Sequence, residues 1–238
     1  MIITPINNNV LNKNKKIQTS FGHGNESFWK SDYSKKEKAV VATTTALGVF
    51  SSLAVLAKIK GHSIKPKDFF NFLKNVPINF TSIATMGVGT CLGGLTGGYI
   101  IDKNPANRKA KRRESVMQFG NILIPIGTVK LTDLALNALK VGDKTIKEQA
   151  IRATTTIGAV VAGIYIANFA MNKLSNALFK NKSEERDIKG TDLFPHVDDL
   201  LASGEYILPG NEYIRKIGRI VPFALMVAGN EIGNKKAN

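Results

Sequence analysis

Long runs without a charged side chain separate this sequence into apolar segments joined by basic connections. Three uncharged windows cover residues 39–57, 75–101 and 153–172 and contain 19, 27 and 20 residues. A helix of 19 residues is about 28 Å long, close to the ~30 Å hydrocarbon core of a bilayer. A soluble helix of this length normally carries charge, because its outer face meets water. The windows therefore predict membrane-spanning helices at about 39–57, 79–101 and 153–172.

Two further apolar segments are less regular. Residues 116–139 are interrupted by Lys130 and Asp133, and Pro125 removes a backbone donor within them. We interpret this segment as a kinked fourth span. Residues 217–232 are short for a span, and we expect them either to cross, to lie in the interface or to re-enter. The predicted fold class is therefore all-α: a polytopic transmembrane helical bundle of four or five spans with short interfacial helices.

The remaining segments are polar. Residues 1–38 are rich in Asn and Lys and lack a helical apolar period, which predicts a flexible basic tail. Residues 66–75 begin with proline and carry three phenylalanines, which predicts a short amphipathic helix on the membrane surface. Residues 180–216 are charged and broken by proline and glycine. We expect them to form a polar region outside the membrane, after a transmembrane bundle that covers 39–179.

The chain carries 33 Lys and Arg against 18 Asp and Glu, a formal net charge of +15. Such an excess favours an anionic partner, either nucleic acid or an acidic lipid surface. In a five-span arrangement the connections on the N-terminal side hold 21 Lys and Arg, and the others hold 12. This bias predicts a cytoplasmic N-terminus in the cell (inner or plasma) membrane. If the fifth span is left out, the counts become 23 and 10 and predict the same orientation.

A basic run lies between two predicted spans, without interleaved aromatic residues or a nucleic-acid-binding motif. We therefore expect its five side chains to contact anionic lipid headgroups and expect no nucleic-acid partner. These side chains are Arg108, Lys109, Lys111, Arg112 and Arg113.

Small residues recur every four positions in several predicted spans. In lipid, helices associate through close backbone approach and van der Waals contact, which small residues allow. The candidate packing residues are Thr85, Gly89, Gly93, Gly97, Gly94, Gly98, Ala159 and Gly163. They predict a tightly packed bundle, whose partners are helices of the same chain, further copies of it or other membrane proteins.

Candidate chemistry is sparse. Lys130 and Asp133 share a helical face and either form a pair on a solute or proton path or lie in the headgroup region. The single Cys91 excludes an intramolecular disulfide. We find no pattern of catalytic or metal-ligating residues and expect no cofactor.

Three functions remain open at this level. The favoured one is a non-enzymatic, multi-pass membrane protein that packs or assembles as a scaffold. The alternative is a small solute or ion transporter or channel that uses the region of Lys130 and Asp133. The third is a soluble basic protein with apolar helices, which the mean hydropathy of −0.05 leaves open.

Overall fold

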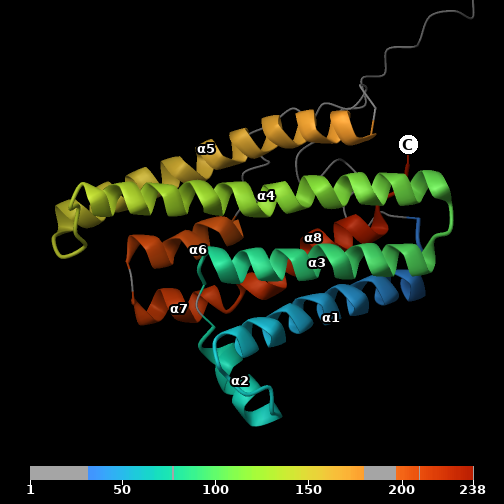
Figure 1. The fold of residues 1–238 in the computed structure, drawn as a ribbon, viewed down its shortest axis with the longest axis horizontal. Helices are drawn as coiled ribbons and strands as arrows, with labels where there is room; N and C mark the ends of the chain where they lie inside the picture. The colour runs from blue at the N-terminus through green and yellow to red at the C-terminus, as the bar shows by residue number, and fades with distance from the viewer. Residues whose placement is uncertain (1–31, 77, 180–196, 209, 238) are drawn as a thin grey trace, which may run out of the picture.

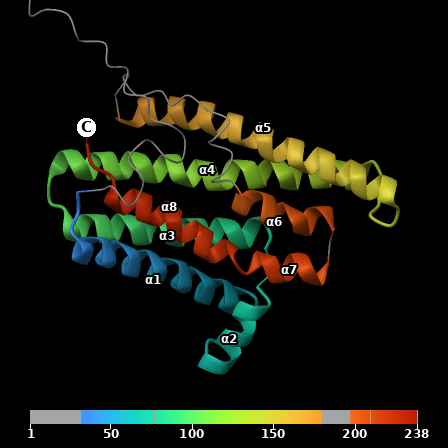
Figure 2. The same cartoon turned by 180° about the vertical axis from the view of Figure 1, so that it is seen from behind.

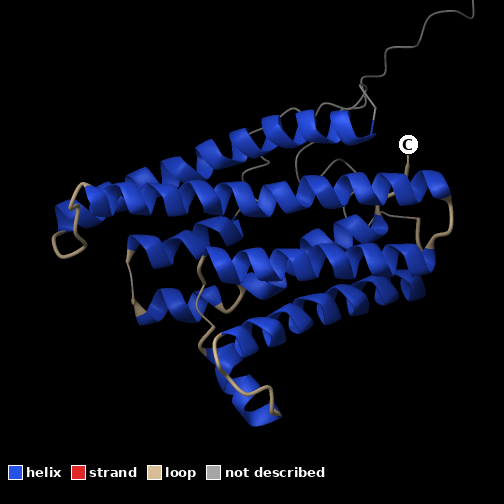
Figure 3. Cartoon of the chain, in the orientation of Figure 1, coloured by secondary structure: helices blue, strands red, loops and turns tan. Residues whose placement is uncertain are grey.

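The computed structural model describes residues 32–76, 78–179, 197–208 and 210–237, and every regular element in these ranges is a helix (Figure 3). This confirms the predicted all-α class. The long helices are α1 (Lys35–Ile59), α3 (Phe80–Ile101), α4 (Pro105–Ala138) and α5 (Ile146–Phe179). The short helices are α2 (Pro66–Lys74), α6 (Val197–Ile207), α7 (Glu212–Gly218) and α8 (Val221–Asn234).

Helix α3 lies at the centre of the bundle. It packs between α1 and α4, and α5 covers the outer side of α4 (Figure 1). Helix α8 lies along α3 on the face seen in Figure 2, where it also contacts α1 and α4. Helix α2 projects from the end of α1, whereas α6 packs against α4 and α5. The remaining surfaces of α1 and α5 form the outside of the bundle.

The bundle has two distinct ends. One holds the start of α1, the end of α3, the start of α4 and the end of α8, and we call it the terminal end (Figure 1). The other holds residues 139–145, which connect α4 to α5, and we call it the turn end. The chain therefore runs toward the turn end in α1 and α4, and toward the terminal end in α3, α5 and α8.

Local capping sets the start of α1. The backbone N–H of Ser34 donates to Glu37 Oε2 at 2.7 Å, and the N–H of Glu37 donates to Ser34 Oγ at 3.3 Å. This capping box satisfies two backbone donors, so α1 begins at Lys35, before the predicted span. Tyr33 is buried as well. The predicted flexible tail therefore ends before Tyr33, and its residues 1–31 lie outside the described part of the chain.

Helices α4 and α5 extend beyond their predicted spans. Each has 34 residues, equivalent to about 51 Å. The Asn104 side chain accepts from the N–H of Ala106 at 2.9 Å and starts α4 at Pro105. The basic run 108–113 is therefore helical and not a loop. Helix α4 also continues through Pro125 as one element.

The C-terminal third differs most from expectation. Of the predicted outside region 180–216, residues 180–196 lie outside the described part, but α6 packs into the bundle with Ala202 and Ser203 buried. The predicted helix 217–232 begins later than expected, because α7 ends at Gly218 and α8 covers Val221–Asn234. With 14 residues, α8 is about 21 Å long, shorter than the ~30 Å hydrocarbon core.

Three helices, α1, α4 and α5, are long and apolar enough to cross a membrane. In the most apolar 18-residue window of α1, 33% of the residues are buried within the protein. The corresponding share is 39% in α4 and in α5. The greater part of each window is therefore at least partly exposed. Helix α3 is not among the three; six of its 22 residues are glycines, which contribute little apolar surface.

Candidate functional site

The first glycine stripe of α3 lies against the backbone of α1. A Cβ atom built on Gly93 would lie 2.8 Å from Thr45 Cα, and one on Gly97 would lie 2.8 Å from Val41 Cα. A Cβ on Gly89 would overlap the carbonyl oxygen of Gly48. Larger residues have no room at these positions. The contact is thus a direct backbone approach of the kind that small residues permit in membrane helices.

The second glycine stripe of α3 lies against α8. A Cβ on Gly98 would lie 2.9 Å from the carbonyl oxygen of Gly233. One turn earlier, Gly94 meets Gly229. Since the contacts advance in the same direction along both helices, α3 and α8 are parallel. Thr90 Oγ1 adds a hydrogen bond, which it donates to a backbone carbonyl of α8 at 2.7 Å.

Helices α4 and α5 meet around Pro125. A Cβ on Gly163 would lie 2.6 Å from Pro125 Cα, and Thr128 Oγ1 donates to the carbonyl oxygen of Ala159 at 2.8 Å. Thr85 differs from the other candidate packing residues. It lies on the partly exposed side of α3, where its hydroxyl donates to the carbonyl oxygen of Thr81 at 2.8 Å.

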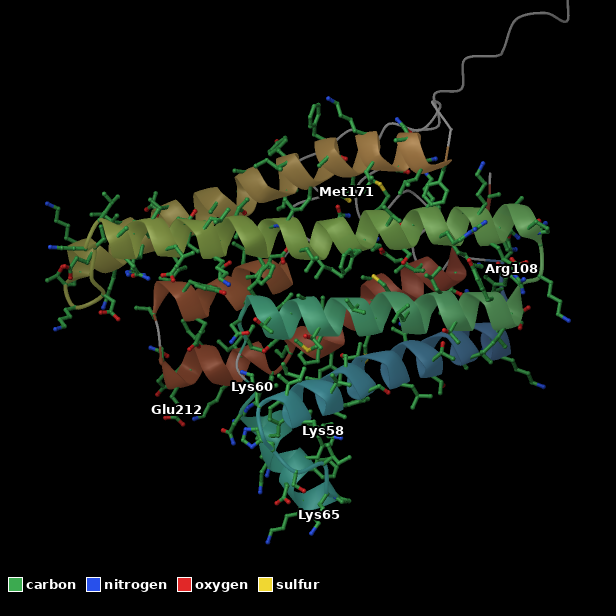
Figure 4. The ribbon with its side chains drawn as sticks, viewed as in Figure 1. Lys58, Lys60, Lys65, Arg108, Met171 and Glu212 are labelled. Atoms are coloured by element: carbon green, nitrogen blue, oxygen red, sulfur yellow. The ribbon has the colours of Figure 1, made fainter. Side chains whose placement is uncertain are left out.

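The basic run does not form one exposed patch. Lys109 and Arg112 are exposed on α4, whereas Arg108, near the terminal end, donates to backbone carbonyls at the end of α3 (Figure 4). Arg113 Nε donates to Ser175 Oγ at 2.8 Å, which ties α4 to the end of α5. Of the five predicted lipid contacts, two are thus freely presented to the surroundings.

Lys111 is the fifth member of the run, and it is fully buried. Its Nζ atom donates to Tyr33 Oη at 3.0 Å and to the carbonyl oxygens of Gly233 and Lys235 at 2.8 and 2.6 Å. Asp102 Oδ2 lies 4.0 Å away. A buried ammonium group with these partners does not contact lipid headgroups, so the expectation for Lys111 is wrong. The residue joins α4 to both ends of the described chain.

Asp102 balances the charge of Lys111. Its carboxylate accepts from the Tyr33 hydroxyl, from Asn107 Nδ2 at 2.7 Å and from the N–H of Asn104 at 2.9 Å. Burial raises the pKa of Asp102, but these hydrogen bonds outweigh it and hold the pKa below its ordinary value. Burial also raises the pKa of Tyr33.

Burial lowers the pKa of Lys111 from 10.5 to about 8, although the nearby Asp102 charge opposes this effect. Lys111 is in the polar first turns of α4, before the predicted span 116–139 begins. At neutral pH the ammonium group, the carboxylate and the phenol coexist as a closed cluster. We call Tyr33, Asp102 and Lys111, with the carbonyl groups of Gly233 and Lys235, the Lys111 clasp.

A second polar contact ties α8 to α4. Gln118 Nε2 donates to Glu114 Oε1 at 3.0 Å and to Glu231 Oε2 at 2.8 Å. Lys235 Nζ lies 3.8 Å from Glu114 Oε2. Together with the Lys111 clasp, this contact fixes the last turn of α8 at the terminal end.

Lys130 and Asp133 do not pair with each other. Lys130 is exposed, with its Nζ atom 5.1 Å from the centroid of the Phe80 ring. Asp133 Oδ1 instead accepts from Arg152 Nη1 of α5 at 2.9 Å. The predicted ion pair within one helix face is therefore replaced by a pair between two helices.

Arg152 is 5% exposed and all three of its guanidinium nitrogens are engaged. Besides Asp133, it donates to the carbonyl oxygens of Val141 and Gly142 at 2.8 and 2.9 Å, and to that of Tyr206 at 3.3 Å. These contacts close the connection between α4 and α5 and attach α6 to it. The adjacent hollow of about 410 Å³ is lined by Asp133 and Arg152, among others. The contacts of Arg152 hold α4, α5 and α6 together, which is a structural role.

An apolar groove of about 600 Å³ runs between α1 and α3 on the outer face of the bundle. Leu47 and Val55 of α1 and Val88 and Leu92 of α3 form its walls, and all four side chains are exposed. The touching glycines of the two helices form its floor.

Comparison of the chain with protein-family models, curated proteins and solved structures gives no match.

Sequence reasoning missed several contact residues. Gly229 and Gly233 are four residues apart, the same spacing that singled out the glycines of α3, so a signal for them was present. Tyr33, Asp102 and Arg152 gave no comparable signal. Their partners are distant in the sequence and become neighbours only when the helices pack.

Proposed function

We propose that this chain is a non-enzymatic, multi-pass integral membrane protein that acts by packing and assembly within the bilayer. The supporting observation is that α1, α4 and α5 are long and apolar, and that most residues of their apolar windows are at least partly exposed. Leu47, Leu131 and Phe169 are 60%, 68% and 62% exposed. Large apolar side chains exposed over several helices are typical of a surface that meets lipid or protein.

The Lys111 clasp favours a fourth crossing. Because Tyr33 and Lys111 are in contact, the starts of α1 and α4 lie at the same end of the bundle. If α1 crosses the membrane, α3 has to return the chain before α4 can begin. We therefore assign four crossings, to α1, α3, α4 and α5. The glycine faces of α3 are covered by α1 and α8, which explains how a helix with six glycines can lie in the bundle.

The same contacts support a topology in which both ends of the described chain lie on one side of the membrane. Ser175 binds Arg113 near the end of α5, and Lys235 binds Lys111 after the end of α8. The described part of the C-terminal segment reaches the turn end in α7 and returns through α8 to the terminal end. We propose that it forms a helical hairpin within the bundle. Arg215, Lys216 and Arg219 then lie toward the turn end, which leaves 20 Lys and Arg toward the terminal end and 13 toward the turn end. This bias favours a cytoplasmic terminal end, with the cell (inner or plasma) membrane as the location.

The geometry supports the transport alternative less well. That alternative depends on Lys130 and Asp133, whose observed contacts hold α4 to α3 and α5. Exposed apolar faces on α1 and α5 favour assembly with further copies or with other membrane proteins. Lys109 and Arg112 remain as candidates for contact with anionic headgroups.

A membrane fractionation experiment tests this proposal. Membranes that contain the protein are washed with alkaline carbonate, and single cysteines are then probed in a Cys91→Ser background with an impermeant thiol reagent. We expect the protein to stay in the membrane. Cysteines at Lys36 and Lys103 should react from one side, and cysteines at Lys67 and Lys144 from the other. Release by carbonate, or a well-behaved monomer in buffer without detergent, contradicts the proposal.

A further inference from the structure

The groove between α1 and α3 has the length of one lipid leaflet. Its lining extends along α1 from Thr44 to Val55. Eleven residues of helix cover about 16 Å, roughly half of the ~30 Å hydrocarbon core. If α1 crosses the membrane, the length of the groove along α1 therefore matches the length of a single acyl chain.

The surface of the groove is suited to an apolar occupant. Its walls are aliphatic, and three of the five hydroxyl groups in its lining bond to their own helices. Thr44 Oγ1 donates to the carbonyl oxygen of Val41 at 3.0 Å, and Ser52 Oγ to that of Val49 at 2.7 Å. The Thr85 hydroxyl is bonded within α3 in the same way. These three hydroxyls already have acceptors within their own helices, so they favour an apolar occupant over a polar ligand.

One end of the groove opens onto a cationic surface. Lys58 is one turn beyond Val55, and residues three apart share a helix face. Figure 4 shows Lys58, Lys60 and Lys65 around the junction of α1 and α2, and all three are exposed. Between Glu37 and Asp102 the sequence contains a single acidic residue, Asp68. The charge at this end therefore complements an anionic group.

We propose that the groove binds one acyl chain of an anionic phospholipid, whose phosphate lies beside Lys58 and Lys60. This inference rests on the proposed membrane function. The lysine stems can extend to the headgroup region while their aliphatic parts stay in the apolar layer. A second copy is a poorer occupant, because parallel copies related by a two-fold axis would bring their Lys58 and Lys60 clusters together. Such like charges repel each other across an interface.

Native mass spectrometry of the full-length protein in mild detergent tests this inference. The probes are phosphatidylglycerol and phosphatidylcholine with identical acyl chains. We expect one bound phosphatidylglycerol and about tenfold weaker binding of phosphatidylcholine, because each lysine near an anionic lipid adds a favourable interaction. The double variant Lys58→Gln, Lys60→Gln should lose this preference. The matched control, Lys35→Gln with Lys36→Gln at the other end of α1, should keep it.

A second pair of variants tests the groove itself. Ser51→Trp places a large ring in the lining and should weaken binding of both lipids about tenfold. Thr43→Trp, at an exposed position of α1 outside the lining, should leave binding unchanged. Equal binding of the two lipids by the wild-type protein overturns the inference. So does a dimer that Ser51→Trp disrupts, because a second copy then occupies the groove.

The same preparation separates the two proposals. If the protein resists the carbonate wash but shows no preference for phosphatidylglycerol, this inference is wrong and the membrane proposal stands. If carbonate releases the protein, both are wrong.

Discussion

The Nζ atom of Lys111 lies 2.8 Å from the carbonyl oxygen of Gly233, which joins the first turns of α4 to the last turn of α8. Gly233 also contacts the backbone of α3, where its Cβ would lie 2.8 Å from the carbonyl oxygen of Gly94. A buried charge and a glycine contact thus occupy the same site. The close approach of α8 to α3 brings its carbonyls within reach of the ammonium group.

Replacement of Lys111 by methionine should loosen the last turn of α8. Methionine keeps an apolar stem but removes three hydrogen bonds and leaves Asp102 buried without its cation. We expect a loss of about 3 kcal/mol in the free energy of unfolding. Hydrogen–deuterium exchange should become faster in residues 233–237. Lys109→Met is the matched control, because Lys109 is exposed on the same helix. Equal exchange in the two variants would show that the clasp does not hold α8.

The stability of the protein should depend on pH through the same lysine. In the folded chain the pKa of Lys111 is about 8, below its ordinary value of 10.5, because of burial. Between these values the unfolded chain binds more protons, so the free energy of unfolding rises with pH. The difference in melting temperature between the wild type and Lys111→Met should therefore increase from pH 7.5 to about 9.5.

Tyr33 limits this increase at higher pH. Its pKa is raised in the folded chain, mainly by burial, so its contribution to stability is lost once the unfolded phenol ionises near its ordinary value of 10.0. A Tyr33→Phe variant should retain the rise that Lys111 causes and lack the decline above that pH. If the difference in melting temperature between the wild type and Lys111→Met decreases from pH 7.5 to pH 9.5, the assignment to Lys111 is wrong.

The apolar windows could be placed from the sequence because absence of charge is a local property. The windows 39–57 and 153–172 lie inside α1 and α5. Their ends could not be placed as well, since polar residues continue each helix where a cap is available, as Ser34 does for α1. The predicted packing glycines lie at helix contacts in the structure, but the sequence did not show which helix each one meets.

The charged contacts depended on tertiary neighbours. A spacing of three residues shows that Lys130 and Asp133 share a helix face, but it does not reveal a stronger partner on another helix. Arg152 is that partner. Likewise, five basic residues within the six positions 108–113 gave no indication that Lys111 turns inward. Its orientation depends on carbonyls of α8 that are more than 100 residues away in the sequence.

Gly93→Ala should weaken the contact between α1 and α3. The added methyl group would lie 2.8 Å from Thr45 Cα and would overlap the backbone of Thr44. We expect a loss of about 1–3 kcal/mol through overpacking, measured as a lower melting temperature in detergent. Gly158→Ala is the matched control on α5, where an added Cβ meets no atom within 4 Å. It should be neutral or stabilise by up to about 1 kcal/mol, because alanine favours helix. If both variants behave alike, close backbone approach does not explain the glycine stripe.

Arg152→Lys should destabilise the turn end even though it keeps the positive charge. Lysine offers one nitrogen in place of the planar fork that reaches Asp133, Gly142 and Tyr206 together. We expect a loss of about 2–4 kcal/mol in the free energy of unfolding, since a partly buried carboxylate and several carbonyls lose their donors. In a double-mutant cycle, Arg152→Lys and Asp133→Asn should show coupling of about 1 kcal/mol or more, because the two side chains touch. Lys130→Gln should lower the free energy of unfolding by no more than about 1 kcal/mol, because the ammonium group of Lys130 is exposed over an aromatic ring.

Proton flux into vesicles that contain each variant distinguishes the structural role from transport. If Asp133→Asn abolishes a flux that the wild type supports while its melting temperature is unchanged, Asp133 serves a path and not a tie between helices.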